Sequence, residues 1–173
     1  MFTRFIPNLL TFANLSFGVL SILEIIKQNY IASAVYIIIA ALLDRYDGKI
    51  ARRLNVCSEF GKELDSFADL VSFGVAPSLL IFMKFNLLDF GLFKFVGTGI
   101  LLLYIISGSY RLAKYNISKF AGAFRGIPIT VAGFVLSIYS LIIPSNRISE
   151  LVSVILLLLL SILMVSKFHF KKI

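Results

Sequence analysis

The segment DRYDGKIARRLNVCSEFGKELDSFAD, residues 44–69, interrupts a chain that is otherwise rich in apolar residues. It contains six of the nine acidic residues in the 173-residue sequence. Four of them are aspartates: Asp44, Asp47, Asp65 and Asp69. Apolar sequence lies on both sides of the segment, so these carboxylates are expected at the ends of two membrane helices, where charged groups are costly and usually functional.

The sequence around this segment has the composition of an integral membrane protein. It is 59% hydrophobic and only 15% charged, whereas soluble domains carry about a quarter charged residues. Uncharged stretches occur at 5–23, 28–43, 70–83, 95–110, 126–146 and 151–166. A spanning helix needs about 20 mostly apolar residues, so the second and third stretches must extend into segment 44–69. We therefore expect an all-α bundle of six transmembrane helices, with no linker, forming one membrane-embedded domain over residues 1–173.

The basic residues are distributed unevenly between the two sides of this predicted bundle. With six spans and the N-terminus inside, only Lys27, Lys84, Lys94 and Arg147 of the 17 lysines and arginines fall outside. The positive-inside rule then places both termini and segment 44–69 in the cytoplasm. The net charge of +8 suits anionic lipid better than nucleic acid, because the charges form no single stripe.

Several other classes of site are disfavoured by the composition. Cys57 is the only cysteine, so the chain cannot form an internal disulfide. His169, the only histidine, lies in the tail FHFKKI, where an interfacial side chain is expected. A zinc centre is not expected without a Cys/His set. The first apolar stretch lacks a small-residue cleavage site and is expected to remain as a helix.

The spacing of the aspartates places each pair on one helix face. Asp44 and Asp47 are three residues apart, and Asp65 and Asp69 are four apart. Small residues share these faces and allow a close helix approach or leave room for a bulky ligand; they are Gly48, Ala51 and Gly61. A short turn between the two helices can therefore bring four carboxylates together.

Four carboxylates in a medium of low dielectric constant repel one another unless cations or protons neutralise them. Carboxylate oxygens suit Mg²⁺, Mn²⁺ or Ca²⁺, and four of them suit a two-metal site that grips phosphate oxygens. The alternative is a solvated loop in which the acidic groups pair with nearby cations, namely Lys49, Arg52, Arg53 and Lys62. The apolar sequence LVSFGVA follows Asp69 directly, which favours a functional site over a loop.

Written out, the segment reads Asp44-x2-Asp47-Gly48-x2-Ala51-Arg52-x8-Gly61-x3-Asp65-x3-Asp69. It resembles the signature of the CDP-alcohol phosphotransferase family at all eight defining positions. This resemblance implies six membrane helices, a common homodimeric state and divalent-metal chemistry on a CDP-linked lipid.

Other phrases resemble one branch of that family, the bacterial CDP-diacylglycerol–serine O-phosphatidyltransferases, or phosphatidylserine synthases. They are PNLLTFANLSFGVLSI, ELDSFADLVSFGVAPS, SGSYRLAKYNI, FRGIPITVAG and LMVSKFHFKKI. Lys114-Tyr115-Asn116 departs from the Arg-Phe-Asn that is frequent in that branch. The branch implies conversion of CDP-diacylglycerol and L-serine to phosphatidylserine and CMP at the cytoplasmic face of a bacterial membrane.

The family resemblance also implies roles for individual residues. Asp44, Asp47, Asp65 and Asp69 would hold one or two Mg²⁺ or Mn²⁺ ions, and Asp69 would also take the proton from the serine hydroxyl. The residues expected to bind CDP-diacylglycerol are Asn8, Thr11, Asp47, Gly48, Ala51, Arg52 and Gly61. For Asn8 and Thr11, helix capping or helix–helix hydrogen bonding is an equal alternative.

Serine carries a carboxylate, so its pocket should contain a cation. Arg111 is the first candidate and Arg125 the second, with Lys114 and Asn116 nearby in sequence. Each basic residue has the alternative role of positive-inside charge or of a contact with anionic lipid.

Other functions remain open from the sequence. The acceptor could be glycerol 3-phosphate or inositol phosphate, as in phosphatidylglycerophosphate and phosphatidylinositol phosphate synthases, although these would require a more basic pocket. An ether-lipid donor would make the protein an archaetidylserine synthase. An ion transporter is a more distant alternative, because transport would place carboxylates near the bilayer midplane rather than all on one side.

Overall fold

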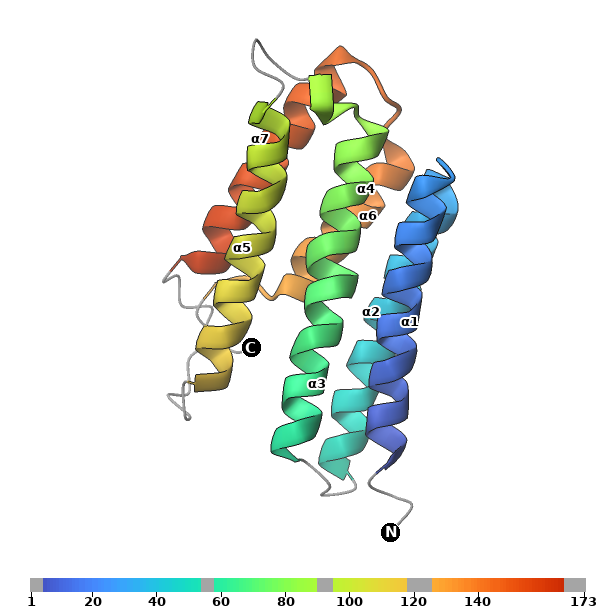
Figure 1. Ribbon diagram of the computed structural model, residues 1–173, viewed down its shortest axis with the longest axis vertical. Coiled ribbons are helices and arrows are strands. Elements are labelled where there is room, and N and C mark those ends of the chain that lie inside the picture. The colour runs from blue at the N-terminus through green and yellow to red at the C-terminus, as the bar shows by residue number, and fades with distance from the viewer. Residues whose placement is uncertain (1–4, 54–57, 90–94, 118–125, 167–173) are drawn as a thin grey trace.

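The computed structural model describes residues 5–53, 58–89, 95–117 and 126–166, with backbone only for 5, 6, 51–53 and 89 (Figure 1). These residues form helices and short connections, and none of them lies in a strand. The α-helices are α1 (Phe5–Ile26), α2 (Tyr30–Arg53), α3 (Glu59–Asp69), α4 (Ala76–Lys84), α5 (Phe95–Ile117), α6 (Ile129–Ile142) and α7 (Arg147–Val165). A π-helix, Leu70–Val75, joins α3 to α4, and a 3₁₀ turn spans Leu87–Asp89.

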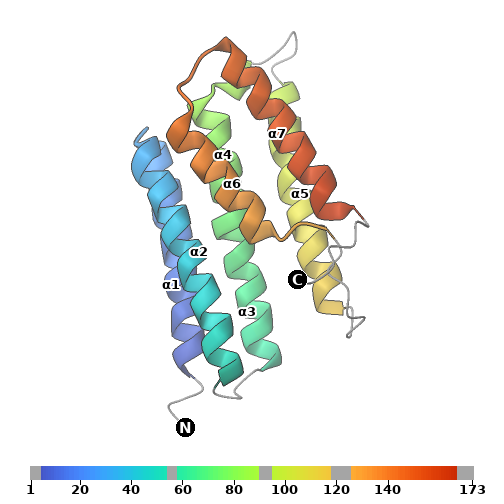
Figure 2. The same cartoon turned by 180° about the vertical axis from the view of Figure 1, so that it is seen from behind.

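The helices form an elongated bundle around the continuous α3–π–α4 segment. The antiparallel helices α1 and α2 pack on one side of this segment, and α5 with α7 lies on the other (Figure 1). Figure 2 shows α6 from behind, crossing the central segment between α2 and α7. The N-terminal end of α1, the C-terminal end of α2 and the start of α3 therefore lie at the same end of the bundle.

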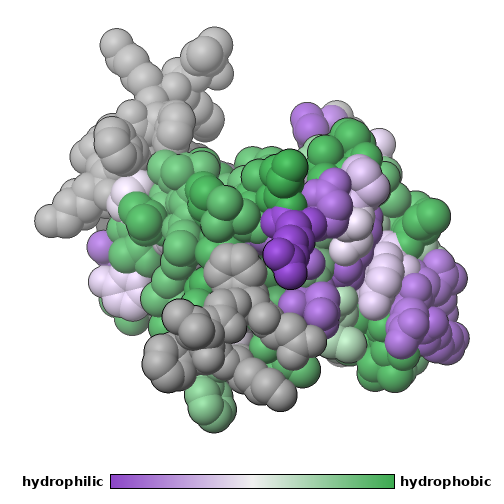
Figure 3. All heavy atoms as spheres, turned by 90° about the horizontal axis from the view of Figure 1, so that it is seen from above, coloured by the Kyte–Doolittle hydropathy of each residue, from purple (hydrophilic) through white to green (hydrophobic). Residues whose placement is uncertain are grey.

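Four helical segments are long and apolar enough to cross a membrane: Pro7–Ile26, Glu59–Lys84, Phe95–Ile117 and Arg147–Val165. Helix α2 carries charged residues in its second half, and α6 is a shorter apolar helix of 14 residues. The predicted all-α membrane class is confirmed, whereas the count of six spans stays a prediction. Large apolar side chains lie exposed along the outer faces, as expected for contact with lipid, and hydrophilic residues gather on part of the upper end (Figure 3).

The π-helix accommodates Pro77 within the central segment. Proline has no N–H to donate and its ring excludes the carbonyl four residues earlier, here that of Phe73. The Ala76 N–H bonds to the Val71 carbonyl, five residues back, which widens the turn. The Phe73 carbonyl accepts a hydrogen bond of 3.2 Å from the buried Tyr104 hydroxyl on α5. The freed backbone group is thus satisfied by a neighbouring helix, as expected for proline in a membrane helix.

Two glycines allow neighbouring helices to reach the π-helix. A Cβ added at Gly18 of α1 would lie 2.3 Å from Ser72 Oγ, and one at Gly133 of α6 would lie 2.9 Å from Phe73 Cα. Only glycine fits such close approaches without displacing the backbone. The contact at Gly18 holds α1 against the segment that carries Asp65 and Asp69.

Candidate active site

The four aspartates come together near the end of the bundle where α2 ends and α3 begins. Asp44 and Asp47 project from α2, and Asp65 and Asp69 from α3. One carboxylate oxygen from each of Asp44, Asp47 and Asp65 lies within 4.8 Å of the other two. The Asp69 carboxyl lies against that of Asp44, close enough for a side-chain hydrogen bond. The helical spacing in the sequence correctly anticipated this convergence.

These carboxylates are largely removed from water. Asp47 is 4% exposed and Asp69 is 8% exposed, while Asp44 and Asp65 are half-buried. Within the described residues the one ion pair joins Lys27 to Glu24, at the opposite end of the bundle. Lys62 instead donates a hydrogen bond to the Asn116 carbonyl, and Arg52 and Arg53 have no described side chains. Like charges at low dielectric constant repel, so the cluster attracts a cation.

Two threonines donate hydrogen bonds to the carboxylates of α2. Thr11 of α1 donates to Asp47 Oδ2 at 3.1 Å, and Thr130 of α6 donates to Asp44 Oδ2 at 3.3 Å. For Thr11 this is the helix–helix hydrogen bond that the sequence left open beside a substrate contact. Thr130 was not predicted, although its position two residues after Pro128, in the first turn of α6, could have suggested it. Each hydrogen bond orients a carboxylate.

Asn8 and Gly61 lie side by side at the edge of the cluster. A Cβ added at Gly61 would lie 3.2 Å from Asn8 Oδ1 and 3.1 Å from Ser58 Oγ. Ser58 caps α3 by accepting the Gly61 N–H at 3.0 Å. The structure therefore joins two residues predicted to bind the nucleotide, which lie 53 positions apart in the sequence. Gly48 is half-buried on α2, whereas the Ala51 and Arg52 side chains lie outside the described residues.

Of the residues predicted to bind serine, Arg111 is the one that the structure relates to the aspartates. It is half-buried on α5, near enough to Asp69 for the two opposite charges to attract. Its buried Nε has no hydrogen-bond partner among the described residues. Lys114 Nζ lies 5.6 Å from the centre of the Tyr110 ring. Arg125 lies outside the described residues.

Asn116 links α5 to α3 beside the cluster. Its Nδ2 donates to Glu63 Oε1 at 3.2 Å and to Ser66 Oγ at 2.9 Å. Its amide donors are therefore already engaged in helix packing. A contact between Asn116 and serine stays a prediction.

The donor set of the cluster fits a hard divalent cation. The candidate ligands are carboxylate oxygens, which Mg²⁺, Mn²⁺ and Ca²⁺ prefer. Asp65 Oδ1 and Asp69 Oδ1 are buried and have no hydrogen-bond partner among the described residues, so they remain available as ligands. Asp44, Asp47 and Asp65 could hold a metal ion; the structure fixes neither its type nor the number of ions.

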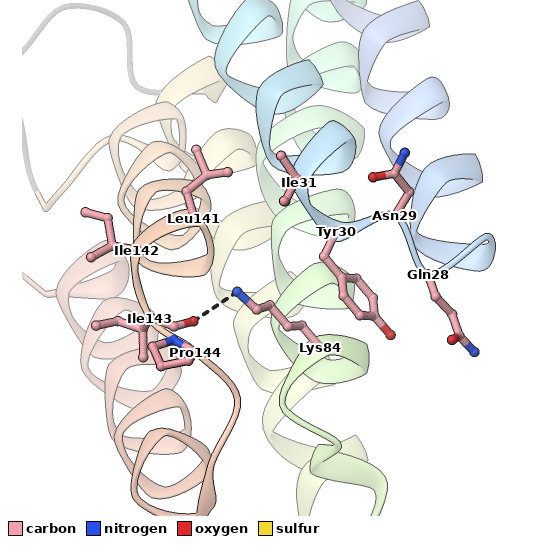
Figure 4. A pocket seen from close by; sticks show the side chains of 9 residues that line it. All are labelled: Gln28, Asn29, Tyr30, Ile31, Lys84, Leu141, Ile142, Ile143 and Pro144. Atoms are coloured by element: carbon pink, nitrogen blue, oxygen red, sulfur yellow. Dashed lines mark hydrogen bonds between the residues drawn. The ribbon is translucent and has the colours of Figure 1, made fainter.

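A separate hollow lies at the other end of the bundle, lined by Gln28, Asn29, Tyr30, Ile31, Lys84 and residues 141–144 (Figure 4). Lys84 points across it and donates to the Ile143 carbonyl at 3.0 Å and also to the Ser140 carbonyl. None of the described residues that line this hollow carries a carboxylate. Its lysine is occupied by backbone groups at the end of α6, so it lacks the chemistry of the aspartate cluster.

Comparison with known proteins agrees with the site. The family model for CDP-alcohol phosphatidyltransferase matches residues 4–166. The CDP-diacylglycerol–serine O-phosphatidyltransferase of Bacillus subtilis is 39% identical over 173 residues, which cover 98% of this chain and 93% of that protein. The Helicobacter pylori enzyme of the same name is 33% identical over 96% of this chain and 73% of its own length. An archaetidylserine synthase from Methanothermobacter thermautotrophicus is 33% identical over 97% of this chain and 70% of its own length.

These matches extend over nearly the whole chain and include the aspartate cluster. The predicted resemblance, made on the spacing of eight residues, is confirmed at the level of the family. The chain belongs to the CDP-alcohol phosphatidyltransferase family.

Proposed function

We propose that this enzyme transfers the phosphatidyl group from CDP-diacylglycerol to the hydroxyl of L-serine, giving phosphatidylserine and CMP. The observation that carries the proposal is the convergence of Asp44, Asp47 and Asp65 oxygens within 4.8 Å, from the adjacent helices α2 and α3. The names of the Bacillus and Helicobacter relatives support serine as the acceptor.

The position of the cluster suits a lipid-linked diphosphate. CDP-diacylglycerol carries its diphosphate at the level of the lipid headgroups and its acyl chains in the bilayer. Asp44, Asp47, Asp65 and Asp69 would hold one or two Mg²⁺ or Mn²⁺ ions beside that diphosphate. A bound divalent ion supplies positive charge to the phosphoryl group and to the CMP leaving group.

Protein side chains carry out the proton transfer and orient the metal ligands. Asp69 accepts the proton of the serine hydroxyl as the serine oxygen forms its bond to the lipid-linked phosphorus. The bond between that phosphorus and the CMP oxygen breaks, and CMP leaves with the bonding electrons. Thr11 and Thr130 orient Asp47 and Asp44 during these steps.

The proposed substrate contacts combine the arrangement around the cluster with the family resemblance. Asn8, Gly48 and Gly61 border the proposed cytidine and diphosphate pocket, to which Ala51 supplies a small wall and Arg52 a phosphate contact. Arg111, which lies within the field of Asp69, receives the serine carboxylate. Arg125, Lys114 and Asn116 are proposed to complete the serine side of the pocket.

The membrane arrangement is part of the same proposal. Both termini and the aspartate cluster face the cytoplasm, where the basic residues concentrate. The chain works as one catalytic domain over residues 1–173 and forms a homodimer, as is common in the family. A transporter is disfavoured because the matching family model and the Bacillus relative are named as transferases.

One alternative has a specific observation in its favour. The relative named archaetidylserine synthase is as similar to this chain as the Helicobacter enzyme, so the lipid part of the donor is less firmly assigned than serine. Phosphorylated acceptors would require a more basic pocket than serine does. They remain the alternatives within the family.

The proposal is tested by measuring CMP release from CDP-diacylglycerol by the purified protein with Mg²⁺ or Mn²⁺. Parallel reactions contain L-serine, glycerol 3-phosphate, inositol phosphate or no acceptor, and one series uses an ether-linked CDP-archaeol donor. Serine-dependent release that chelator abolishes is the expected result. Release with another acceptor would exclude serine, and no metal-dependent release with any acceptor would exclude the transferase reaction.

A further inference from the structure

Asn14 is a buried polar residue of α1 that the proposed chemistry does not use. Its exposed fraction is 0%. Neither Nδ2 nor Oδ1 has a hydrogen-bond partner in the parts of the chain that the structure describes. Burying an amide without partners costs folding free energy, and such a group in a native protein usually has a functional reason or a bound water.

The contacts on either side of Asn14 place it next to the aspartate cluster. Thr11, one turn earlier on the same buried face of α1, donates to Asp47 Oδ2. The backbone carbonyl of Asn14 accepts a hydrogen bond of 3.1 Å from Ser72 Oγ, and Ser72 lies one turn beyond Asp69. Asn14 therefore packs against the turn that follows Asp69, one helix turn farther along α1 than the contact with Asp47.

The unpartnered groups in this region are chemically complementary. Asp69 Oδ1 and Asp65 Oδ1 are buried acceptors without partners among the described residues, and Asn14 Nδ2 is a buried donor. A water that accepts from Nδ2 can donate its own protons to a carboxylate oxygen. Buried waters typically make about three such bonds to groups that otherwise have none.

We propose that Asn14 is a positioning residue for the reaction: its amide, through one bound water, orients the Asp69 carboxylate for metal binding and for proton acceptance from the acceptor hydroxyl. The inference rests on the proposed transferase function. Asn14 touches neither substrate, and its effect on the reaction passes through Asp69.

The main test is Asn14→Leu, which keeps the branching at Cγ and removes both polar atoms. With L-serine as acceptor, kcat should fall about 10- to 100-fold, the usual effect of removing the group that orients a metal ligand. KM for each substrate should change little, because Asn14 contacts neither. Binding of Mn²⁺ alone, followed by electron paramagnetic resonance, should weaken. The unfolding temperature in detergent should not fall, since no hydrogen bond to a described group is lost.

A matched control lies two turns along the same helix face. Ser21 is also fully buried, but its hydroxyl pairs with Ser33 Oγ at 2.8 Å. Ser21→Ala should lower the unfolding temperature and leave kcat and Mn²⁺ affinity unchanged. The two variants thus separate a positioning role from a packing role.

A second pair keeps the test decisive if leucine disrupts the fold. Asn14→Ser and Asn14→Ala are similar in size and differ in one hydroxyl donor, so the serine variant should retain more turnover and tighter Mn²⁺ binding. Equal turnover and Mn²⁺ affinity in the wild type and Asn14→Leu, or in the Ser and Ala variants, would overturn the proposal. If the wild type released no CMP, the proposed function would fail, while the Mn²⁺ comparison would still test Asn14.

Discussion

Most buried polar groups have hydrogen-bond partners at one end of the bundle, whereas several lack them at the other end. At the far end, which contains the connections 27–29 and 143–146, polar groups find partners inside the protein: Ser21 with Ser33, Tyr139 with the Ser149 carbonyl at 3.0 Å, and Lys84 with carbonyls at the end of α6. Asn146 and Ser149 form a reciprocal capping box at the start of α7. The Ser140 hydroxyl is the exception there.

At the aspartate end, the described structure leaves polar atoms of Asn14, Asp65, Asp69 and Arg111 buried without partners. A satisfied buried network stabilises a fold, whereas an unsatisfied one costs stability and is retained for another reason. The comparison indicates that the far end maintains the bundle and that the aspartate end gives up stability for ligand binding. Substitutions at the aspartate end should therefore change turnover or metal affinity, and substitutions at the far end should change stability.

The largest expected effect is on activity at the aspartate end. Asp69→Asn should reduce kcat about 10²- to 10⁴-fold, because an amide cannot accept the acceptor's proton. The unfolding temperature should stay the same or rise, since one buried charge is removed from a repelling cluster. CMP release and thermal unfolding of the same preparation measure both quantities. A large loss of stability would contradict the contrast between the two ends.

Arg111→Lys sharpens the assignment of the serine pocket. Lysine keeps the charge but loses the planar fork that binds a carboxylate through two hydrogen bonds. KM for serine should rise about tenfold, roughly 1.4 kcal/mol, with KM for CDP-diacylglycerol nearly unchanged. Initial rates measured at varied serine and fixed CDP-diacylglycerol concentrations give KM for serine. If the donor KM rises instead, Arg111 belongs to the diphosphate pocket.

Thr130→Val tests whether a single hydrogen bond positions Asp44. The change is close in shape and removes the donor to Asp44 Oδ2. Mn²⁺ affinity should fall about tenfold, at the lower end of the range for groups that orient metal ligands. A titration of Mn²⁺ without substrate measures this. Ser137→Ala on the same helix is the control, because its hydroxyl donates to the Gly133 carbonyl of its own helix.

The smallest effect is expected at the far end. Tyr139→Phe removes the hydroxyl that donates to the Ser149 carbonyl and contacts Ser153 Oγ at 3.3 Å. It should cost about 0.6–1.7 kcal/mol of stability, as buried hydrogen bonds in membrane proteins do. Turnover should equal that of the wild type. Loss of turnover without loss of stability would show that the far end also serves the reaction.

Local features of the sequence were sufficient to predict the helical membrane class and the aspartate cluster. Helical periodicity puts Asp44 and Asp47 on one helix face, and Asp65 and Asp69 on another, independently of the rest of the chain. The two helices are adjacent in sequence, so their meeting required only a short connection. The accommodation of Pro77 was also foreseeable, because a freed carbonyl in a membrane helix needs a partner. The sequence did not indicate that Tyr104 would be that partner.

Contacts between distant segments were decided by the tertiary structure alone. Thr130 reaches Asp44 across 86 positions, and no local pattern specifies such a pairing. The sequence ranked Arg111 ahead of Arg125 as the residue that binds serine but could not say which basic residue faces the site, and it was helix packing that placed Arg111 within the field of Asp69. The sequence by itself determined which groups could carry the chemistry, because residue type and helical spacing are local properties. Only the packing of α1, α5 and α6 around the central segment decided which groups orient the carboxylates, because those contacts depend on how distant helices approach.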